Sequence, residues 1–139
     1  MRELDFLLML NQYINSLNLV GTAGRTLVSK IGLLQTTESI AISASPGGAE
    51  NVFYDGSRDK EYQVQISCKS LRQDVCMNAL NNLSTKLENL SNLMSGNDSY
   101  EFQGINITSL PSLLGEDDKN YFIWVVSISA QLHIRKEVI

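Results

Sequence analysis

The charged stretch from Asp55 to Glu61 is the part of the sequence best equipped for acid–base chemistry. It reads Asp-Gly-Ser-Arg-Asp-Lys-Glu, so three carboxylates are interleaved with two cations. General acid–base catalysis requires carboxylates in contrasting environments inside a cleft. Here water and neighbouring opposite charges keep each group ionised, and Asp-Gly-Ser is typical of a turn in which Asp55 accepts a hydrogen bond from the downstream backbone. The stretch predicts a turn between two strands rather than a catalytic loop.

The lone histidine and the two cysteines are the other candidates for nucleophilic or metal chemistry. No Cys or carboxylate stands at a ligand spacing around His133, which falls on the polar side of a strand pattern. We expect a solvated or interface histidine. Cys68 and Cys76 fall on apolar faces, where burial raises the pKa of a thiol and suppresses its nucleophilicity. Reduced, buried thiols are expected, and the sequence predicts no catalytic residue, no cofactor and no metal.

Loops that bind phosphate or cations are also absent from the sequence pattern. SPGGAEN at 45–51 matches neither G-x-x-x-x-G-K-[ST] nor G-x-G-x-x-G, and GEDDK at 115–119 lacks the oxygen-ligand pattern of a calcium or magnesium loop. A net charge of −4 argues against a surface that grips nucleic-acid phosphates. The apolar run LDFLLML is short and contains Asp5, so neither a secretory signal nor a membrane segment is predicted.

The first half of the chain combines a helical pattern with strand patterns. Residues 3–17 repeat apolar side chains at helical spacing, and Gly21 ends the pattern. Residues 26–34 fit either a strand or a short helical turn, whereas Ile40, Ile42 and Ala44 alternate as in a strand. Residues 62–69 alternate strictly, which predicts a half-buried strand whose polar face stays uncharged until Lys69.

The second half predicts a long helix followed by two strands. Ser70-Leu71-Arg72-Gln73 matches a capping box, and an apolar seam at four- and three-residue spacing runs towards Gly96, so a helix is expected over 71–94. A strand over 99–110 changes phase at Gly104, where a β-bulge is expected. Pro111 and GEDDKN form the next connection. The last strand, 122–134, is apolar on both faces near its start, so that part should be central or covered.

These elements predict one α+β domain over residues 1–139. The sheet is mixed and largely antiparallel, with an N-terminal helix and a long central helix packed on one face. A chain of this length buries about two-thirds of its unfolded surface. It therefore needs no disulfide or metal to stabilise it.

The stretch ASPGGAENVFYDGSRDKEYQVQISCKS, residues 44–70, resembles the middle of minor capsid or tail terminator proteins of long-tailed (siphovirus-like) phages of Gram-positive bacteria. The shared pattern is Pro-Gly-Gly, a short gap, Tyr-Asp-Gly-Ser-Arg, and then a strand of aromatic, Gln and apolar residues that leads into the long helix. The matching positions are Pro46, Gly47, Gly48, Tyr54, Asp55, Gly56, Ser57, Arg58, Tyr62, Gln65 and Ile66.

Three further segments extend the resemblance over nearly the whole chain. They are NLVGT at 18–22, NDSYEF at 97–102 and the closing aromatic-to-apolar strand. Two departures stand out: Val64 occupies a position that is usually aromatic, and TLVSKIGLLQ at 26–35 is harder to match.

The resemblance implies a structural virion protein and not an enzyme. Such a protein, made in the host cytoplasm, forms a homohexameric ring on the last ring of the tail tube protein at the head-proximal end of the tail. The ring stops polymerisation of the tube and joins it to the head-tail connector or head completion protein, with no membrane involved. DNA passes through the lumen without specific binding, and an acidic lumen repels it.

Subunit contacts are expected around the charged stretch and the polar face of the strand next to it. The uncharged polar face of that strand would meet a neighbour or the lumen, and the mixed charges suit an interface. The candidate interface residues are Asp55, Arg58, Asp59, Lys60, Glu61, Gln63 and Gln65.

Two other classes of function stay open on the sequence alone. One is a homo-oligomeric adaptor unrelated to phage, which would share the fold but not bind tube ends. The other is a small enzyme or ligand-binding domain with a pocket between the sheet and the helix at 71–94. A ligand-binding domain should respond to a ligand in a thermal-shift screen, whereas a terminator should not.

Overall fold

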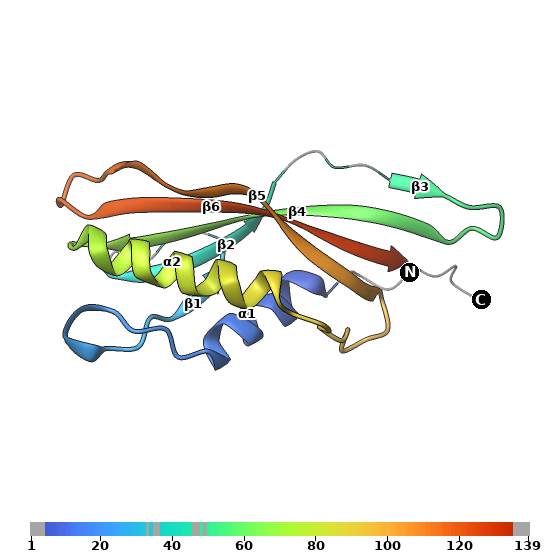
Figure 1. The fold of residues 1–139 in the computed structure, drawn as a ribbon, viewed down its shortest axis with the longest axis horizontal. Helices are drawn as coiled ribbons and strands as arrows, with labels where there is room; N and C mark the ends of the chain where they lie inside the picture. The colour runs from blue at the N-terminus through green and yellow to red at the C-terminus, as the bar shows by residue number, and fades with distance from the viewer. Residues whose placement is uncertain (1–4, 33, 35–36, 46–47, 49, 135–139) are drawn as a thin grey trace.

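The computed structural model describes residues 5–32, 34, 37–45, 48 and 50–134. Two helices, a short 3-10 turn and six strands follow one another in the predicted order of helix and strand regions (Figure 1). They are α1 (Phe6–Ser16), η1 (Thr22–Gly24), β1 (Ser29–Ile31), β2 (Ser39–Ala44), β3 (Glu50–Val52), β4 (Arg58–Ser70), α2 (Gln73–Glu88), β5 (Glu101–Glu116) and β6 (Phe122–Ile134). The predicted α+β class is confirmed.

The strands form one mixed sheet in the order β1-β2-β4-β6-β5, with β3 paired to the first residues of β4. Only the β1–β2 pair is parallel, so the sheet is largely antiparallel, as predicted. Both helices lie on the same side of the sheet, and no helix of the described residues covers the other side (Figure 1). We call that second side the helix-free face.

The hydrophobic core lies between the helices and the sheet. Phe6, Leu10 and Ile14 recur four residues apart and form the buried stripe of α1. The strands contribute alternate residues to the same core, as a period of two requires. Its fully buried strand and α2 side chains include Ile40, Ile42, Val64, Ile66, Cys68, Cys76, Leu80, Leu83, Leu87, Ile128, Ala130 and Leu132.

The predicted bounds of the long helix are wrong at both ends. Ser70 is the last residue of β4 and is not the N-cap, a position that Arg72 takes. The Ser70 hydroxyl donates to Glu38 Oε2 at 2.5 Å and accepts from the Arg72 amide at 3.1 Å, so it reaches the residue before the helix and no amide inside it. The helix begins at Gln73 and ends at Glu88, six residues before the predicted end. Gly96 does not terminate it, since its amide donates to Asp5 Oδ2 at 2.7 Å in a separate loop.

Strands β4 and β5 extend beyond their predicted bounds, whereas β6 has the predicted ones. β4 begins at Arg58, and β5 runs through Pro111 to Glu116, so that Pro111 lies within a strand rather than in the connection. Proline is tolerated there because β5 is an edge strand. The predicted β-bulge at Gly104 is confirmed, and three further register shifts occur in β5. The ambiguous segment at 26–34 contains strand β1. Residues 3–4 of the predicted helix, residue 33 of the ambiguous segment, and Pro46, Gly47 and Ala49 of the predicted loop lie outside the described residues.

Asp5 joins the start of α1 to the loop that leads into β5. Its carboxylate accepts hydrogen bonds from the Ser95 hydroxyl at 2.7 Å and the Ser99 hydroxyl at 3.0 Å. It also accepts from the backbone amides of Gly96 at 2.7 Å and Asn97 at 3.2 Å. These four bonds fix the position of α1 against a segment some 90 residues away in the sequence.

Candidate functional site

The tip of the β3–β4 hairpin is a turn centred on Asp55. Asp55 Oδ1 accepts from the Ser57 hydroxyl at 2.6 Å and from the Ser57 amide at 2.9 Å, while Gly56 takes the left-handed φ of 89°. The hydrogen bonds from Ser57 lower the pKa of this exposed carboxyl. The predicted turn is confirmed at Asp55–Ser57, but Arg58–Glu61 belongs to β4 and not to a loop.

The charged residues at the start of β4 are paired with near neighbours. Arg58 lies 3.4 Å from a Glu50 carboxylate oxygen, and Asp59 lies 2.7 Å from Nδ1 of His133. The expected solvated or interface histidine is therefore a partly exposed side chain in contact with a carboxylate.

The seven candidate interface residues do not form one surface. Because side chains of a strand alternate between faces, Arg58 and Lys60 lie on the helix side of β4, where Lys60 Nζ is 5.8 Å from the ring centre of Tyr62. Asp55 lies in the turn. The helix-free face carries Asp59, Glu61, Gln63 and Gln65.

The helix-free face has an uncharged polar centre built by three strands. Gln63 pairs with Ser129 and Gln65 with Ser127 of β6, and Asn106 of β5 pairs with Ser129 on its other side. Sequence reasoning identified the β4 side chains but missed those of β5 and β6. The signal was present in the alternation of β6, whose polar positions, Ser127, Ser129, Gln131 and His133, are every second residue.

The helix-free face becomes apolar towards the turn between β5 and β6. Ile123 and Val125 are half-buried there although no helix covers them. Their strand lies between β4 and β5, which confirms the prediction that this part of β6 is central. The adjoining acidic turn is also confirmed, with Asp117 2.7 Å from Lys69 Nζ.

Two hairpins carry exposed apolar side chains that sequence reasoning missed. The β3–β4 tip presents Val52, Phe53 and Tyr54. The β5 leucine patch consists of Leu110, Leu113 and Leu114. These features lie towards opposite ends of the long axis of the molecule (Figure 1).

Both cysteines are free thiols without solvent exposure. Cys76 Sγ donates to the backbone oxygens of Cys68 at 3.4 Å and of Phe122 at 3.8 Å. Contact with the Cys76 thiol and burial raise the pKa of Cys68. The prediction of buried thiols is confirmed.

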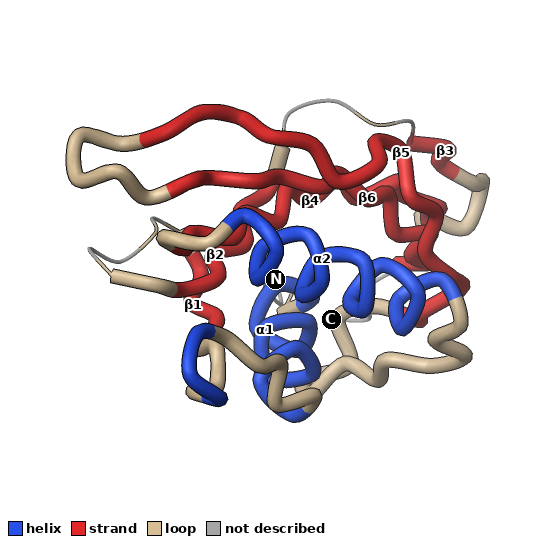
Figure 2. Tube along the Cα trace, turned by 60° about the vertical axis from the view of Figure 1, so that its left-hand side comes forward, coloured by secondary structure: helices blue, strands red, loops and turns tan. Residues whose placement is uncertain are grey.

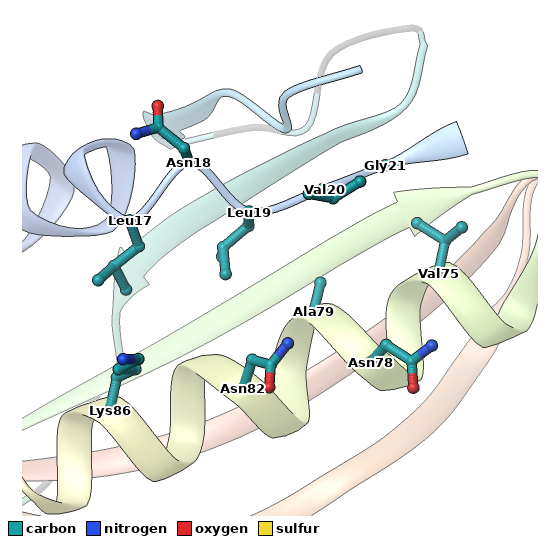
Figure 3. Close-up of a pocket in the computed structure, with 10 residues that line it drawn as sticks. All are labelled: Leu17, Asn18, Leu19, Val20, Gly21, Val75, Asn78, Ala79, Asn82 and Lys86. Atoms are coloured by element: carbon teal, nitrogen blue, oxygen red, sulfur yellow. The ribbon is translucent and has the colours of Figure 1, made fainter. Parts of the chain in front are cut away.

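A groove of about 450 Å³ lies between α2 and residues 17–21 (Figure 3). This is not the location expected for a ligand pocket, which was between α2 and the sheet. That space is filled by core side chains, among them Leu80, Leu83 and Ile66. Among the residues that the structure describes, no three His, Cys, Asp or Glu side chains are placed to hold a metal ion. Within the same ranges, neither helix is long and apolar enough to cross a membrane.

Comparison with protein families decides between the classes that the sequence left open. A family model described as "Bacteriophage tail terminator protein" matches residues 13–134. The chain belongs to the bacteriophage tail terminator family. None of the curated proteins compared with the chain matches it. The resemblance found in the sequence is confirmed, and membership of this family gives the chain a structural role as a component of the phage virion.

Proposed function

We propose that this terminator forms a hexameric ring on the last ring of the tail tube, at the head-proximal end of the tail. The ring stops addition of tube protein and presents its other side to the head-tail connector or head completion protein. A protein in this position makes contacts in several directions, with neighbours in the ring and with two different partners. Its exposed apolar surface should therefore be divided among separate sites.

The observation that carries the proposal is the pair of exposed apolar hairpin surfaces at opposite ends of the molecule. Groups of large exposed apolar side chains, unlike single ones, mark interaction sites in soluble proteins. The β3–β4 tip and the β5 leucine patch come from different hairpins and consist of different side chains, two aromatic rings and a valine in one and three leucines in the other, so they suit different partners. None of these six side chains belongs to the hydrophobic core of the monomer, so they are available to partners.

The charge distribution supports passage of DNA through the ring without specific binding. Proteins that hold nucleic acid neutralise its phosphates with clustered Lys and Arg side chains. The centre of the helix-free face consists instead of Gln, Ser and Asn, and the chain carries a net charge of −4. Six such chains would repel DNA rather than retain it.

The test is the number of copies in the assembly, measured in two settings. Light scattering after size exclusion gives the mass of the free protein over a concentration series, and image averaging of capped tail tubes gives the symmetry at their ends. We expect six times the chain mass of 15.5 kDa in solution, or a six-fold ring at the tube end. A dimer or monomer in solution, together with tube ends that carry no six-fold ring, would overturn the proposal.

A further inference from the structure

The groove beside α2 has the form of a docking site for an extended segment. Val75, Ala79 and Leu19 are buried and form its apolar base. Asn78, Asn82 and Lys86 follow one another at four-residue spacing along α2 and point towards the facing segment (Figure 3). Of the ten residues that line the groove, Lys86 is the one that carries a charge.

The opposite wall of the groove is held in place by the rest of the fold. Residues 17–21 connect α1 to η1, and Val20 forms an isolated antiparallel bridge with Thr26. Glu38 fixes the end of this wall by accepting from the Thr22 amide at 2.9 Å and from its hydroxyl at 2.6 Å. The groove is therefore bounded on both sides before any partner arrives.

The hairpin formed by β5 and β6 exposes apolar and acidic side chains, which complement the apolar base and the cation of the groove. Its β5 strand exposes the leucine patch and ends at the exposed carboxylate of Glu116, and its turn carries the exposed carboxylate of Asp118. Asp117 forms an ion pair with Lys69. Lys119 offsets one of the two exposed carboxylates, Glu116 and Asp118, so this end of the hairpin keeps a negative charge. The turn extends beyond α2 and the remaining strands (Figure 2).

We propose that the β5–β6 hairpin of one copy docks in the groove between α2 and residues 17–21 of the next copy. The leucine patch covers the apolar base, and Glu116 at the end of β5 meets Lys86. This assignment rests on the proposed ring, because it names the contact that joins neighbouring subunits.

The arrangement of the fold favours a contact between copies over one within a chain. β5 and β1 form the two opposite edges of the sheet. The hairpin contains β5, whereas residues 17–21 precede β1 in the sequence. The contact therefore joins two different surfaces of the same chain. Such heterologous contacts generate rings when the rotation between copies closes, whereas a contact between identical surfaces gives a two-fold dimer.

Charge reversal tests the contact. Lys86→Glu places two acids together and should raise the concentration for half-maximal ring assembly about tenfold, a change well above measurement error. Glu116→Lys should do the same, and the double variant should assemble like the unmodified protein because the pair is restored with opposite signs. Lys30→Glu, which reverses an exposed cation on β1 away from the groove, is the matched control and should change little. Thermal melting should be nearly the same for all four variants.

Cross-linking tests the same contact without altering its charges. Asn82→Cys and Leu114→Cys are prepared as separate proteins, mixed, and treated with a short bis-maleimide, to which the buried native thiols are inaccessible. We expect linked heterodimers only in the mixture, and none when Met94→Cys, an exposed site outside the hairpin, replaces Leu114→Cys.

The outcomes separate this contact from the ring itself. If Lys86→Glu forms six-fold rings as readily as the unmodified protein, and the mixture of Asn82→Cys and Leu114→Cys gives no linked heterodimer, the docking contact is overturned and the proposed ring is not. Absence of any ring in the unmodified protein would overturn both.

Discussion

Phe6→Ala should lower the free energy of unfolding by about 3–5 kcal/mol, the usual cost of removing a buried aromatic ring. Phe6 has no solvent exposure. Its ring lies edge-on to those of Tyr62, at 5.3 Å between centres, and Tyr100, at 5.6 Å. The substitution leaves a cavity where α1 meets the sheet, and it removes both aromatic contacts. Urea denaturation followed by circular dichroism measures the change.

Leu8→Ala is the matched control on the same helix. Leu8 is 48% exposed, so truncation removes little buried surface and creates no cavity. We expect a loss of under about 1 kcal/mol, consistent with substitutions at exposed positions. Equal effects of the two substitutions would contradict the placement of the Phe6 stripe against the sheet.

Asp5→Asn should cost about 2 kcal/mol at neutral pH, because hydrogen bonds to a charged acceptor become hydrogen bonds to a neutral one. The variant keeps the shape of the side chain while removing its charge. Asp98→Asn, in the same loop, is the control. Asp98 is exposed and has a left-handed φ of 59°, which asparagine tolerates well, so no loss is expected there.

The pH dependence separates the charge of Asp5 from its shape. Partial burial raises the pKa of this carboxyl, but the bonds from Ser95, Gly96, Ser99 and Asn97 outweigh burial, and the pKa lies below its ordinary value of 3.8. A lowered native pKa contributes stability above the unfolded-state pKa, and that contribution is lost as the pH falls through the native value. The stability difference between Asp5→Asn and the unmodified protein should therefore be constant near neutrality and shrink below about pH 4. A difference that stays the same at pH 3 would show that the charge is not its cause.

Local periodicity was sufficient to predict the fold class. The stripe of α1, the alternation at 62–69 and the apolar length of β6 are each patterns within a single element, and each element formed as predicted. The phase change at Gly104 identified a bulge because a strand must keep its apolar side chains on one face.

Element boundaries depended on contacts that no local pattern contains. Ser70-Leu71-Arg72-Gln73 has the sequence of a capping box, yet the Ser70 hydroxyl donates to Glu38, 32 residues earlier, and accepts from the amide of Arg72 rather than that of Gln73. Gly96 is a reasonable helix terminator, but its amide binds Asp5. In both cases the residue makes a hydrogen bond to a distant side chain that the local motif does not contain.

The candidate interface was only partly predictable for a related reason. Treating Asp55–Glu61 as a loop grouped its charges together, whereas strand geometry separates Arg58 from Asp59. Residues 58–61 belong to β4 because they pair with residues 131–134 of β6, and residues 58–60 also pair with the three exposed residues of β3, a contact that no local pattern of 55–61 contains. The leucine patch of β5 was missed because Pro111 appeared to end the strand before Leu113 and Leu114.

The measurement that tests the central claim most directly is the growth of tail tubes in the presence of this terminator. Tubes are assembled from the tube protein of the same phage and given further tube protein with or without the terminator, and their lengths are recorded by electron microscopy. We predict that the terminator, at amounts equivalent to a few copies per tube end, stops elongation at the capped end. Tubes that elongate equally with and without it would contradict the assignment of this chain as the protein that caps the tube.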